Sequence, residues 1–355
     1  MKNLTPLTSM TSPAVIFQGQ GTNWQLALAD AAATPMTHAR LNSLLDAARS
    51  VTGPIARPLA SSVPGVVERL RAIMDPDQAT AANDVDRLPA VSVPGIVLAQ
   101  IAATDQLRGL GLDIDSAALA GHSQGSLGVA AASHPEHALA FAFILGAAAS
   151  ATSSGRDARS RMLSVRGIHR GDLDRFLGTQ PAVVNGPRHV VFSGEPAELE
   201  AAVSAINAAA AEFNARLEAA EFGGSEVNPV YDFLPVAYPF HNEGNEDAVE
   251  LAVKWAQACG IDLGETTPRD LAQAILHDPH DYPALVRGLL DQGVSHIVAL
   301  DPAVASITTK LVAGAGVPVI TADSATARDN LARPGAPVPE AADYSRFAPL
   351  SLIHI

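Results

Sequence analysis

The sequence predicts an α/β protein: a hydrolase-like domain built on a parallel sheet, with an inserted ferredoxin-like subdomain. Short apolar runs alternate with helix-like segments early in the chain, which is the order of a parallel sheet covered by helices. The pentapeptide GHSQG at residues 121–125 fits the tight G-x-S-x-G turn between a strand and a helix. Residues 162–236 then run strand, helix, two strands, helix, strand, which is typical of a ferredoxin-like unit.

The first elements lead up to the pentapeptide. Residues 14–17 form a short apolar run, β-branched at its centre, which predicts a strand that opens into the glycine-rich turn 18–21. Residues 93–110 are predicted as a helix, because apolar side chains recur there at three- and four-residue spacing and a proline suits the first turn. The apolar run 117–120 predicts the strand before the turn, and residues 127–132 the helix after it.

The remaining elements divide the chain. In the insertion we expect strands at 162–165, 182–184, 189–193 and 230–236, helices at 171–177 and 196–218, and a hairpin turn at Asn185-Gly186. The main domain is predicted to resume near Pro239, with helices at 247–259 and 283–292 and strands at 296–300 and 317–321. The predicted division is therefore residues 1–160 and 239–332 for the core, 161–238 for the subdomain and 333–355 for a linker, which begins rich in proline and alanine.

Composition narrows the class of protein. The chain has 355 residues, of which 48% are hydrophobic and 17% charged, which is enough for a sizeable core. Its net charge of −14 disfavours general attraction to nucleic acid or anionic lipid. The one cysteine, Cys259, cannot form an intramolecular disulfide and fits a reducing compartment. No apolar stretch reaches membrane-spanning length uninterrupted, and residues 1–11 lack the apolar core of a signal peptide. We expect a cytoplasmic protein with no nucleic-acid or membrane partner.

Ser123 is the candidate nucleophile. In a G-x-S-x-G turn the glycines let the backbone bend so sharply that the serine Oγ stands clear of it. The N–H of the next residue points into the same space, so the turn supplies a nucleophile together with half of an oxyanion hole.

A serine nucleophile needs a base, and His241 is the candidate among eleven histidines. It is predicted to follow a strand directly, beside Pro239, which fixes the loop and so presents the ring rigidly. Four other histidines have no such context: His134, His137, His189 and His296. The HDPHD run at 277–281 lacks a partner with known ligand spacing, so a solvated loop is expected there and no metal site.

Four segments resemble, in their order and spacing, the acyl-CoA:acyl-carrier-protein transacylases, which include the malonyl-CoA enzymes. They are the turn 19–21, the pentapeptide, the hairpin segment 184–194 and Pro239-Phe240-His241, and the resemblance covers almost the whole chain. Within this family the chain looks most like the N-terminal acetyltransferase domain of actinobacterial type I fatty acid synthases, through residues 91–95, 100–104, 119–125 and 344–350. The resemblance implies a piece of a longer multienzyme, toward which the linker 333–355 would lead.

The resemblance also implies roles for individual residues. Ser123 would attack the thioester of acyl-CoA, His241 would take its proton, and the acyl group would pass to the phosphopantetheine thiol of an acyl carrier protein domain, to prime fatty acid synthesis. Backbone N–H groups of Gln20 and Gln124 would form the oxyanion hole. The backbone carbonyl near Ile275 would orient His241. The implied partners are acyl-CoA, the carrier domain and the other synthase domains, with no permanently bound cofactor.

Two departures from the family pattern bear on specificity and local structure. Malonyl-specific relatives carry an arginine roughly twenty-five residues after the serine, which pairs with the malonyl carboxylate. The segment 143–149 has no cation here, so Leu145, Gly146, Ala147 and Ala148 are predicted to line a pocket for acetyl or another uncharged acyl group. The alternative is a malonyl-specific transacylase in which Arg156, Arg159 or Arg161 folds back. The second departure is Asp301-Pro302-Ala303, where relatives have Gly-Pro-Gly.

Two other functions remain open at this level. A serine hydrolase or thioesterase would need an acid between serine and histidine, and Asp232 is the nearest acid before His241, although the gap between them is short. A non-catalytic structural domain is disfavoured by the presence of both Ser123 and His241.

Overall fold

The computed structural model describes residues 10–62, 64–75, 84–153, 158–177, 180–219, 226–324 and 327–328. The predicted linker 333–355 and Arg156 lie outside these residues.

The larger sheet has four parallel strands in the order β2-β1-β8-β9. They are β1 (Pro13–Phe17), β2 (Ala118–Gly121), β8 (His296–Ala299) and β9 (Val319–Thr321). Phe17 at the end of β1 pairs with Gly121 at the end of β2. Because the carboxyl ends of parallel strands share one edge, the glycine-rich turn after β1 lies beside the GHSQG turn after β2.

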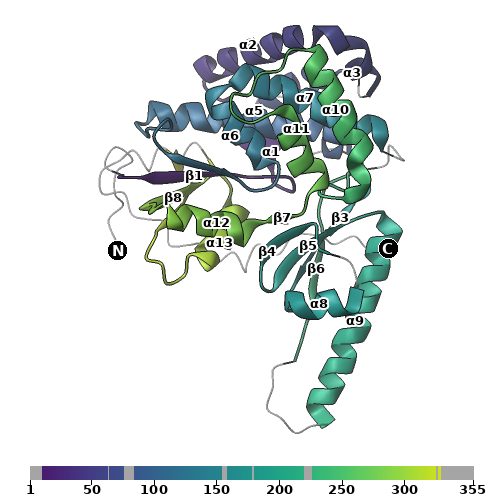
Figure 1. Cartoon of the computed structure of the whole chain (residues 1–355). Helices are drawn as coiled ribbons and strands as arrows, with labels where there is room; N and C mark the ends of the chain where they lie inside the picture. Colours follow the sequence, from purple (N-terminus) through teal and green to yellow (C-terminus); the bar gives the residue numbers. More distant parts are fainter. Residues whose placement is uncertain are drawn as a thin grey trace.

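Helices cover both faces of this sheet, as a parallel sheet requires (Figure 1). Val15 and Phe17 pack toward α5 (Pro89–Gly109) and α6 (Gly125–Ser133) on one face. Ala14 and Ile16, which alternate with them, pack toward α12 (Tyr282–Asp291) and α13 (Pro302–Leu311) on the other. The all-apolar run that predicts β1 therefore reflects a strand buried on both sides.

A larger helical layer lies over the α5 side and contains most of the core. Its members are α1 (Trp24–Ala31), α2 (Pro35–Val51), α3 (Ala56–Ser62), α4 (Val66–Met74), α7 (Pro135–Thr152), α10 (Glu246–Ala258) and α11 (Pro268–Ala272), with short turns of helix at Gly53–Ile55, Asp84–Arg87, Glu243–Asn245 and Gln273–His277. Of these helices, the sequence predicted only α10, at 247–259. α5 begins four residues before the predicted start, so Pro94 lies inside it. By length and hydropathy α5 resembles a membrane span, but 89% of that window is buried inside the protein, as in a core helix.

The smaller sheet has the predicted ferredoxin-like arrangement. Its strands β3 (Met162–Arg166), β4 (Val183–Gly186), β5 (His189–Ser193) and β6 (Val230–Phe233) pair antiparallel in the order β6-β3-β5-β4, with α8 (Arg170–Leu177) and α9 (Pro196–Ala219) as the two helices. The predicted hairpin turn is wrong by two residues: Asn185 and Gly186 end β4, and the turn falls at Pro187-Arg188. The fold class is confirmed.

A two-residue strand, β7 (His280–Asp281), adds a fifth, parallel strand to the smaller sheet. It pairs Val183 with His280 and Val184 with Asp281, and it runs directly into α12 of the larger unit (Figure 1). The expectation of a solvated loop at 277–281 is therefore wrong at His280. So short a strand has no periodicity to detect in a sequence.

Candidate active site

The GHSQG turn forms the expected elbow. Ser123 has φ +56°, a left-handed conformation that costs energy for a residue with a Cβ. The flanking glycines allow neighbouring backbone to come close to the turn. A Cβ on Gly121 would lie 2.1 Å from the Ser126 nitrogen, and one on Gly125 would lie 2.3 Å from the Phe17 oxygen. Backbone hydrogen bonds from the His122 N–H to Phe17 and from the Gly125 N–H to His122, both 2.9 Å, tie the elbow to β1 and close its turn.

Ser123 and His241 meet although 118 positions separate them. The Ser123 Oγ lies 2.6 Å from the His241 Nε2, and both residues are buried. The His241 Nδ1 lies 2.8 Å from the Asp278 carbonyl oxygen, which can only accept, so Nδ1 carries the proton. Nε2 of the neutral ring is then free to accept from the Ser123 hydroxyl, which is the arrangement of a serine and its general base.

The prediction of Ile275 as the orienting carbonyl is wrong by three residues. The Ile275 oxygen accepts instead from the backbone N–H of His241 at 3.2 Å. The turn 273–277 is a π-helix that ends just before Asp278, and this brings the Asp278 carbonyl to the ring. His241 itself has φ +57° and lies eight residues beyond the end of β6 at Phe233, so it does not follow the strand directly as expected.

Burial sets the protonation of His241. Removal of the ring from water lowers its pKa to about 4, and the Asp278 carbonyl only partly opposes this. His241 is therefore neutral at physiological pH and available as a base.

The glycine-rich turn docks on the elbow through side-chain amides. Gln20 donates from Nε2 to the Gln124 Oε1 at 2.5 Å and to the Ser92 Oγ at 3.1 Å, and Gln124 donates to the Val93 carbonyl at 3.0 Å. A Cβ on Gly19 would lie 3.0 Å from the Ser123 Cβ, so only glycine allows this approach. Within the described part of the chain, the backbone N–H groups of Gln20 and Gln124 donate to no protein acceptor. Their oxyanion role stays a prediction that this geometry permits.

The predicted acyl-pocket residues do not line an open pocket in this structure. Leu145 and Ala148 are fully enclosed and Ala147 nearly so, within a helix that is buried almost throughout. A Cβ on Gly146 would lie 2.3 Å from the Pro89 oxygen, so this position holds α7 against the start of α5. An apolar run does not reveal by itself whether it faces a cavity or a neighbouring helix. Of the alternative cations, Arg161 is buried and paired with Glu195.

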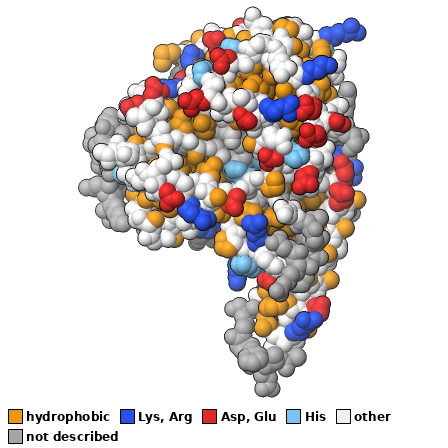
Figure 2. All heavy atoms as spheres, in the orientation of Figure 1, with side chains coloured by type: hydrophobic (Ala, Val, Ile, Leu, Met, Phe, Trp, Pro, Cys, Tyr) orange, Lys and Arg blue, Asp and Glu red, His pale blue; other side chains and the backbone are white. Residues whose placement is uncertain are grey.

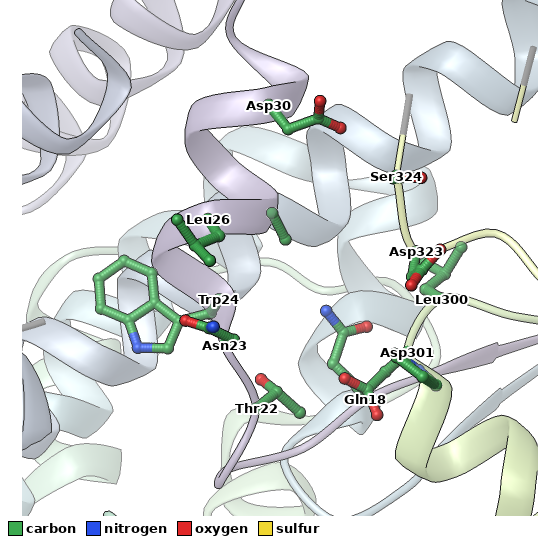
Figure 3. A pocket seen from close by; sticks show the side chains of 12 residues that line it. Gln18, Thr22, Asn23, Trp24, Leu26, Asp30, Leu300, Asp301, Asp323 and Ser324 are labelled. Carbon is green, nitrogen blue, oxygen red and sulfur yellow. The ribbon is translucent and has the colours of Figure 1, made fainter. Parts of the chain in front are cut away.

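A separate cavity of about 280 Å³ lies beside the glycine-rich turn, with Gln18 and Thr22 among the residues that line it (Figure 3). It is lined by Gln18, by residues of α1 and its preceding loop, and by Asp301 and Asp323, but not by Ser123 or His241. Asp301 accepts from the backbone N–H groups of Ala303 and Val304 and so caps α13. The departure from the Gly-Pro-Gly pattern thus replaces a glycine turn by a side-chain cap.

Other candidate groups are accounted for elsewhere. Asp232 pairs with Arg166 in the smaller sheet, so it does not complete a hydrolase-type triad with His241. His277 bonds Asp278 and Gln273 at the surface. Within the described residues no group of three or more His, Cys, Asp or Glu is placed to hold a metal ion. On the face shown in Figure 2, basic side chains lie apart among acidic ones.

Two polar side chains that sequence reasoning did not assign support the elbow. His122 donates from Nε2 to the Asn185 Oδ1 of β4 at 2.7 Å. His280 accepts at Nε2 from the Ser123 N–H at 3.2 Å. His122 belongs to the elbow, but its partner Asn185 lies on β4 and His280 lies on β7, far along the chain, so no local sequence signal marks these contacts.

The buried neutral histidines predict a stability that falls in acid. His189 and His241 each have a pKa lowered to about 4, chiefly by burial, against 6.5 for the free side chain. Their stabilising effect is complete above pH 6.5 and is lost as the pH falls from 6.5 to about 4, because the unfolded chain binds protons that the folded chain excludes. In that window each of the two histidines should lower the free energy of unfolding by about 1.4 kcal/mol for each pH unit of acidification.

Urea unfolding at pH 7, 6 and 5 measures this slope. His189→Gln should make the slope shallower, whereas the same substitution at the exposed His169 serves as control. An unfolding free energy that does not change between pH 7 and pH 5 would contradict the assignment.

Comparison with known proteins establishes the fold. No protein-family model matches the chain, and no curated protein matches it. The malonyl CoA-acyl carrier protein transacylase of Coxiella burnetii matches with a TM-score of 0.64 and 16% identity, over 95% of this chain and 100% of that one. A structure of a type II polyketide synthase acyl-carrier protein in complex with its malonyl-transacylase matches with a TM-score of 0.62 and 17% identity, over 90% and 99%. The acyltransferase domain of the second module of the salinomycin polyketide synthase matches with a TM-score of 0.58 and 18% identity, over 88% and 69%.

Proposed function

We propose that this chain is an acyl-CoA:acyl-carrier-protein S-acyltransferase. The observation that carries the proposal is the buried pair of Ser123 and His241, 2.6 Å apart, with the second ring nitrogen held by a backbone carbonyl. Solved structures with the same fold include malonyl-transacylases, one of them in complex with its acyl-carrier protein.

The reaction follows from the protonation of the pair. The Ser123 hydroxyl gives its proton to the His241 Nε2 as Oγ attacks the thioester carbonyl, and the oxyanion that forms lies where the Gln20 and Gln124 N–H groups are available. The C–S bond breaks, the CoA sulfur takes the proton from His241, and the acyl group remains as an ester on Ser123. The phosphopantetheine thiol of a carrier protein then gives its proton to Nε2 and attacks this ester. Ser123 regains its proton, and the acyl group leaves as a new thioester.

Labelled acetyl-CoA tests the proposal directly. Incubation without carrier protein should give a stable acyl-enzyme of one acetyl group on Ser123, seen by mass spectrometry, and addition of holo carrier protein should discharge it. Release of free acetate at the same rate without the carrier would indicate a hydrolase, and no reaction with any acyl-CoA would indicate a non-catalytic domain.

For the acyl group, we propose acetyl or another uncharged acyl chain. The support is that α7 offers no cation between residues 143 and 149, where malonyl-specific members of the resembled family place arginine, and that Arg161 is engaged with Glu195. A malonyl carboxylate buried without a cation would lose its water without gaining a partner.

Competitive loading measures this preference. With equimolar acetyl-CoA and malonyl-CoA, the acetyl ester on Ser123 should exceed the malonyl ester by at least about 10-fold, a ratio that corresponds to about 1.4 kcal/mol in transition-state binding. Arg161→Ala is the matched control and should leave the ratio unchanged. Equal loading of the two acyl groups, or a malonyl ester that forms on the unsubstituted protein and is lost in Arg161→Ala, would favour the malonyl-specific alternative. Either result would leave the proposed acyltransferase activity in place.

We further propose that the chain is the acetyltransferase portion of a cytoplasmic type I fatty acid synthase. The support is the resemblance at residues 91–95, 100–104 and 119–125, together with the fact that one structure of this fold is a domain of a polyketide synthase module. An immunoblot of source cells should show a band far larger than the 36.6 kDa of this chain. A single band at that mass would contradict the proposal.

A further inference from the structure

The ring of His280 contacts both members of the Ser123–His241 pair. Its Nε2 lies 3.2 Å from the backbone nitrogen of Ser123, which donates to it. Its centroid lies 5.8 Å from that of His241, with 30° between the ring planes, and 5.1 Å from that of His122 in an edge contact. No other described side chain both accepts from the elbow backbone and lies against the base.

The Ser123 N–H depends on this acceptor. The neighbouring N–H groups of His122 and Gly125 donate to backbone carbonyls, but the Ser123 N–H donates to His280. Ser123 is only 8% exposed, so loss of the acceptor would leave a buried, unpaired donor. Because Ser123 also has φ +56°, its conformation persists only where the surroundings hold it.

His280 is itself rigidly placed. Its backbone N–H donates to the Ala182 carbonyl at 2.9 Å, and β7 pairs it with Val183 of the smaller sheet. Two residues on, the fully buried Tyr282 hydrogen-bonds Thr308 of α13 at 2.6 Å. The ring is thus fixed between the two sheets. Burial lowers the pKa of His280 well below its usual value, and His122 and His241 add to this, so the ring is neutral. Because the Ser123 N–H can only donate, Nε2 is the ring nitrogen that accepts.

We propose that His280 is a positioning residue that accepts the Ser123 N–H and holds the serine backbone so that Oγ is directed at the His241 Nε2. The inference rests on the proposed function in taking Ser123 as the nucleophile. It assigns a role in the site to β7, which joins the smaller sheet to the catalytic unit.

Three substitutions of one side chain separate hydrogen bonding from packing. In His280→Gln the side-chain Oε1 can reach about the position of the imidazole Nε2, so it can still accept the hydrogen bond. In His280→Asn the side chain is shorter by one methylene group, so its amide oxygen does not reach that position. His280→Leu has no acceptor at all. The readouts are the maximal rate of Ser123 acylation by acetyl-CoA, the half-saturating acetyl-CoA concentration, the rate of Ser123 labelling by a fluorophosphonate probe, and the melting temperature.

We expect His280→Leu and His280→Asn to lower both rates by about 10- to 100-fold, the scale of a nucleophile displaced by about 1 Å, with the half-saturating concentration changed less than about 2-fold. His280→Gln should keep both rates within about 3-fold of the unsubstituted protein. Unchanged rates in the leucine variant would overturn the proposal. So would rates that fall equally in the Gln and Leu variants, or that follow the melting temperature across all three, because a packing role predicts these results.

The probe keeps the two proposals distinguishable. If no acyl-CoA acylates the unsubstituted protein, the proposed function fails, but the fluorophosphonate rates of the three variants still show whether His280 positions Ser123. If His280→Leu does not fold, the Gln and Asn variants carry the same comparison.

Discussion

Ser123→Ala is expected to abolish acyl-enzyme formation completely, because the substitution removes the only atom that carries the acyl group. The alanine variant incubated with acetyl-CoA should show no mass increase, whereas the unsubstituted protein gains one acetyl group. The fold should remain, since the change removes one hydroxyl and its hydrogen bond to His241, worth about 1 kcal/mol.

Ser133→Ala is the matched control, because Ser133 is exposed at the end of the helix that follows the elbow. It should acylate normally. An acetyl group found on the Ser123→Ala protein would assign the nucleophile to another residue.

His241→Ala is expected to lower the rate of Ser123 acylation by roughly 10²- to 10⁴-fold, the usual effect of losing a general base. The ring accepts from the Ser123 hydroxyl at 2.6 Å. Without the ring, no positioned base remains to take the hydroxyl proton as Oγ attacks the thioester. Single-turnover acylation at pH 7 measures the loss. Imidazole added to the buffer tests whether the missing group is a base, because the substitution leaves a space of that size beside Oγ.

His137→Ala serves as control, since that ring lies at the start of α7 and accepts from the Asp262 backbone N–H. A near-normal rate in His241→Ala would place the base elsewhere. His122 would then be the first residue to substitute, although its Nε2 is occupied by Asn185.

Local sequence patterns were sufficient for the fold class, and they also singled out Ser123 and His241, two side chains that the structure brings into contact. A strand buried on both faces leaves an apolar run, as at Pro13–Phe17. An elbow needs glycines where backbones touch, as at Gly121 and Gly125. The order of elements between β3 and β6 predicted the ferredoxin-like unit correctly. These features are readable because short-range sterics and side-chain periodicity determine them.

The same patterns were insufficient where an outcome depends on which segments meet. The run 143–149 predicted a pocket wall and instead fills a helix interface, because apolar side chains suit either setting. Ile275 and Asp278 both offer a carbonyl, and only the π-helical turn decides which one reaches the His241 ring.

The sequence by itself determined the GHSQG turn at Ser123, the alternation of strands and helices, and the candidacy of His241, since each rests on neighbouring residues. Only the tertiary structure decided that the Asp278 carbonyl holds the His241 ring, that Asn185 holds His122, and that His280 accepts the Ser123 N–H. The physical reason is that these hydrogen bonds join residues 37, 63 and 157 positions apart. Their geometry exists only once the two sheets have packed, and a short parallel pairing at His280–Asp281 gives no periodic signal beforehand.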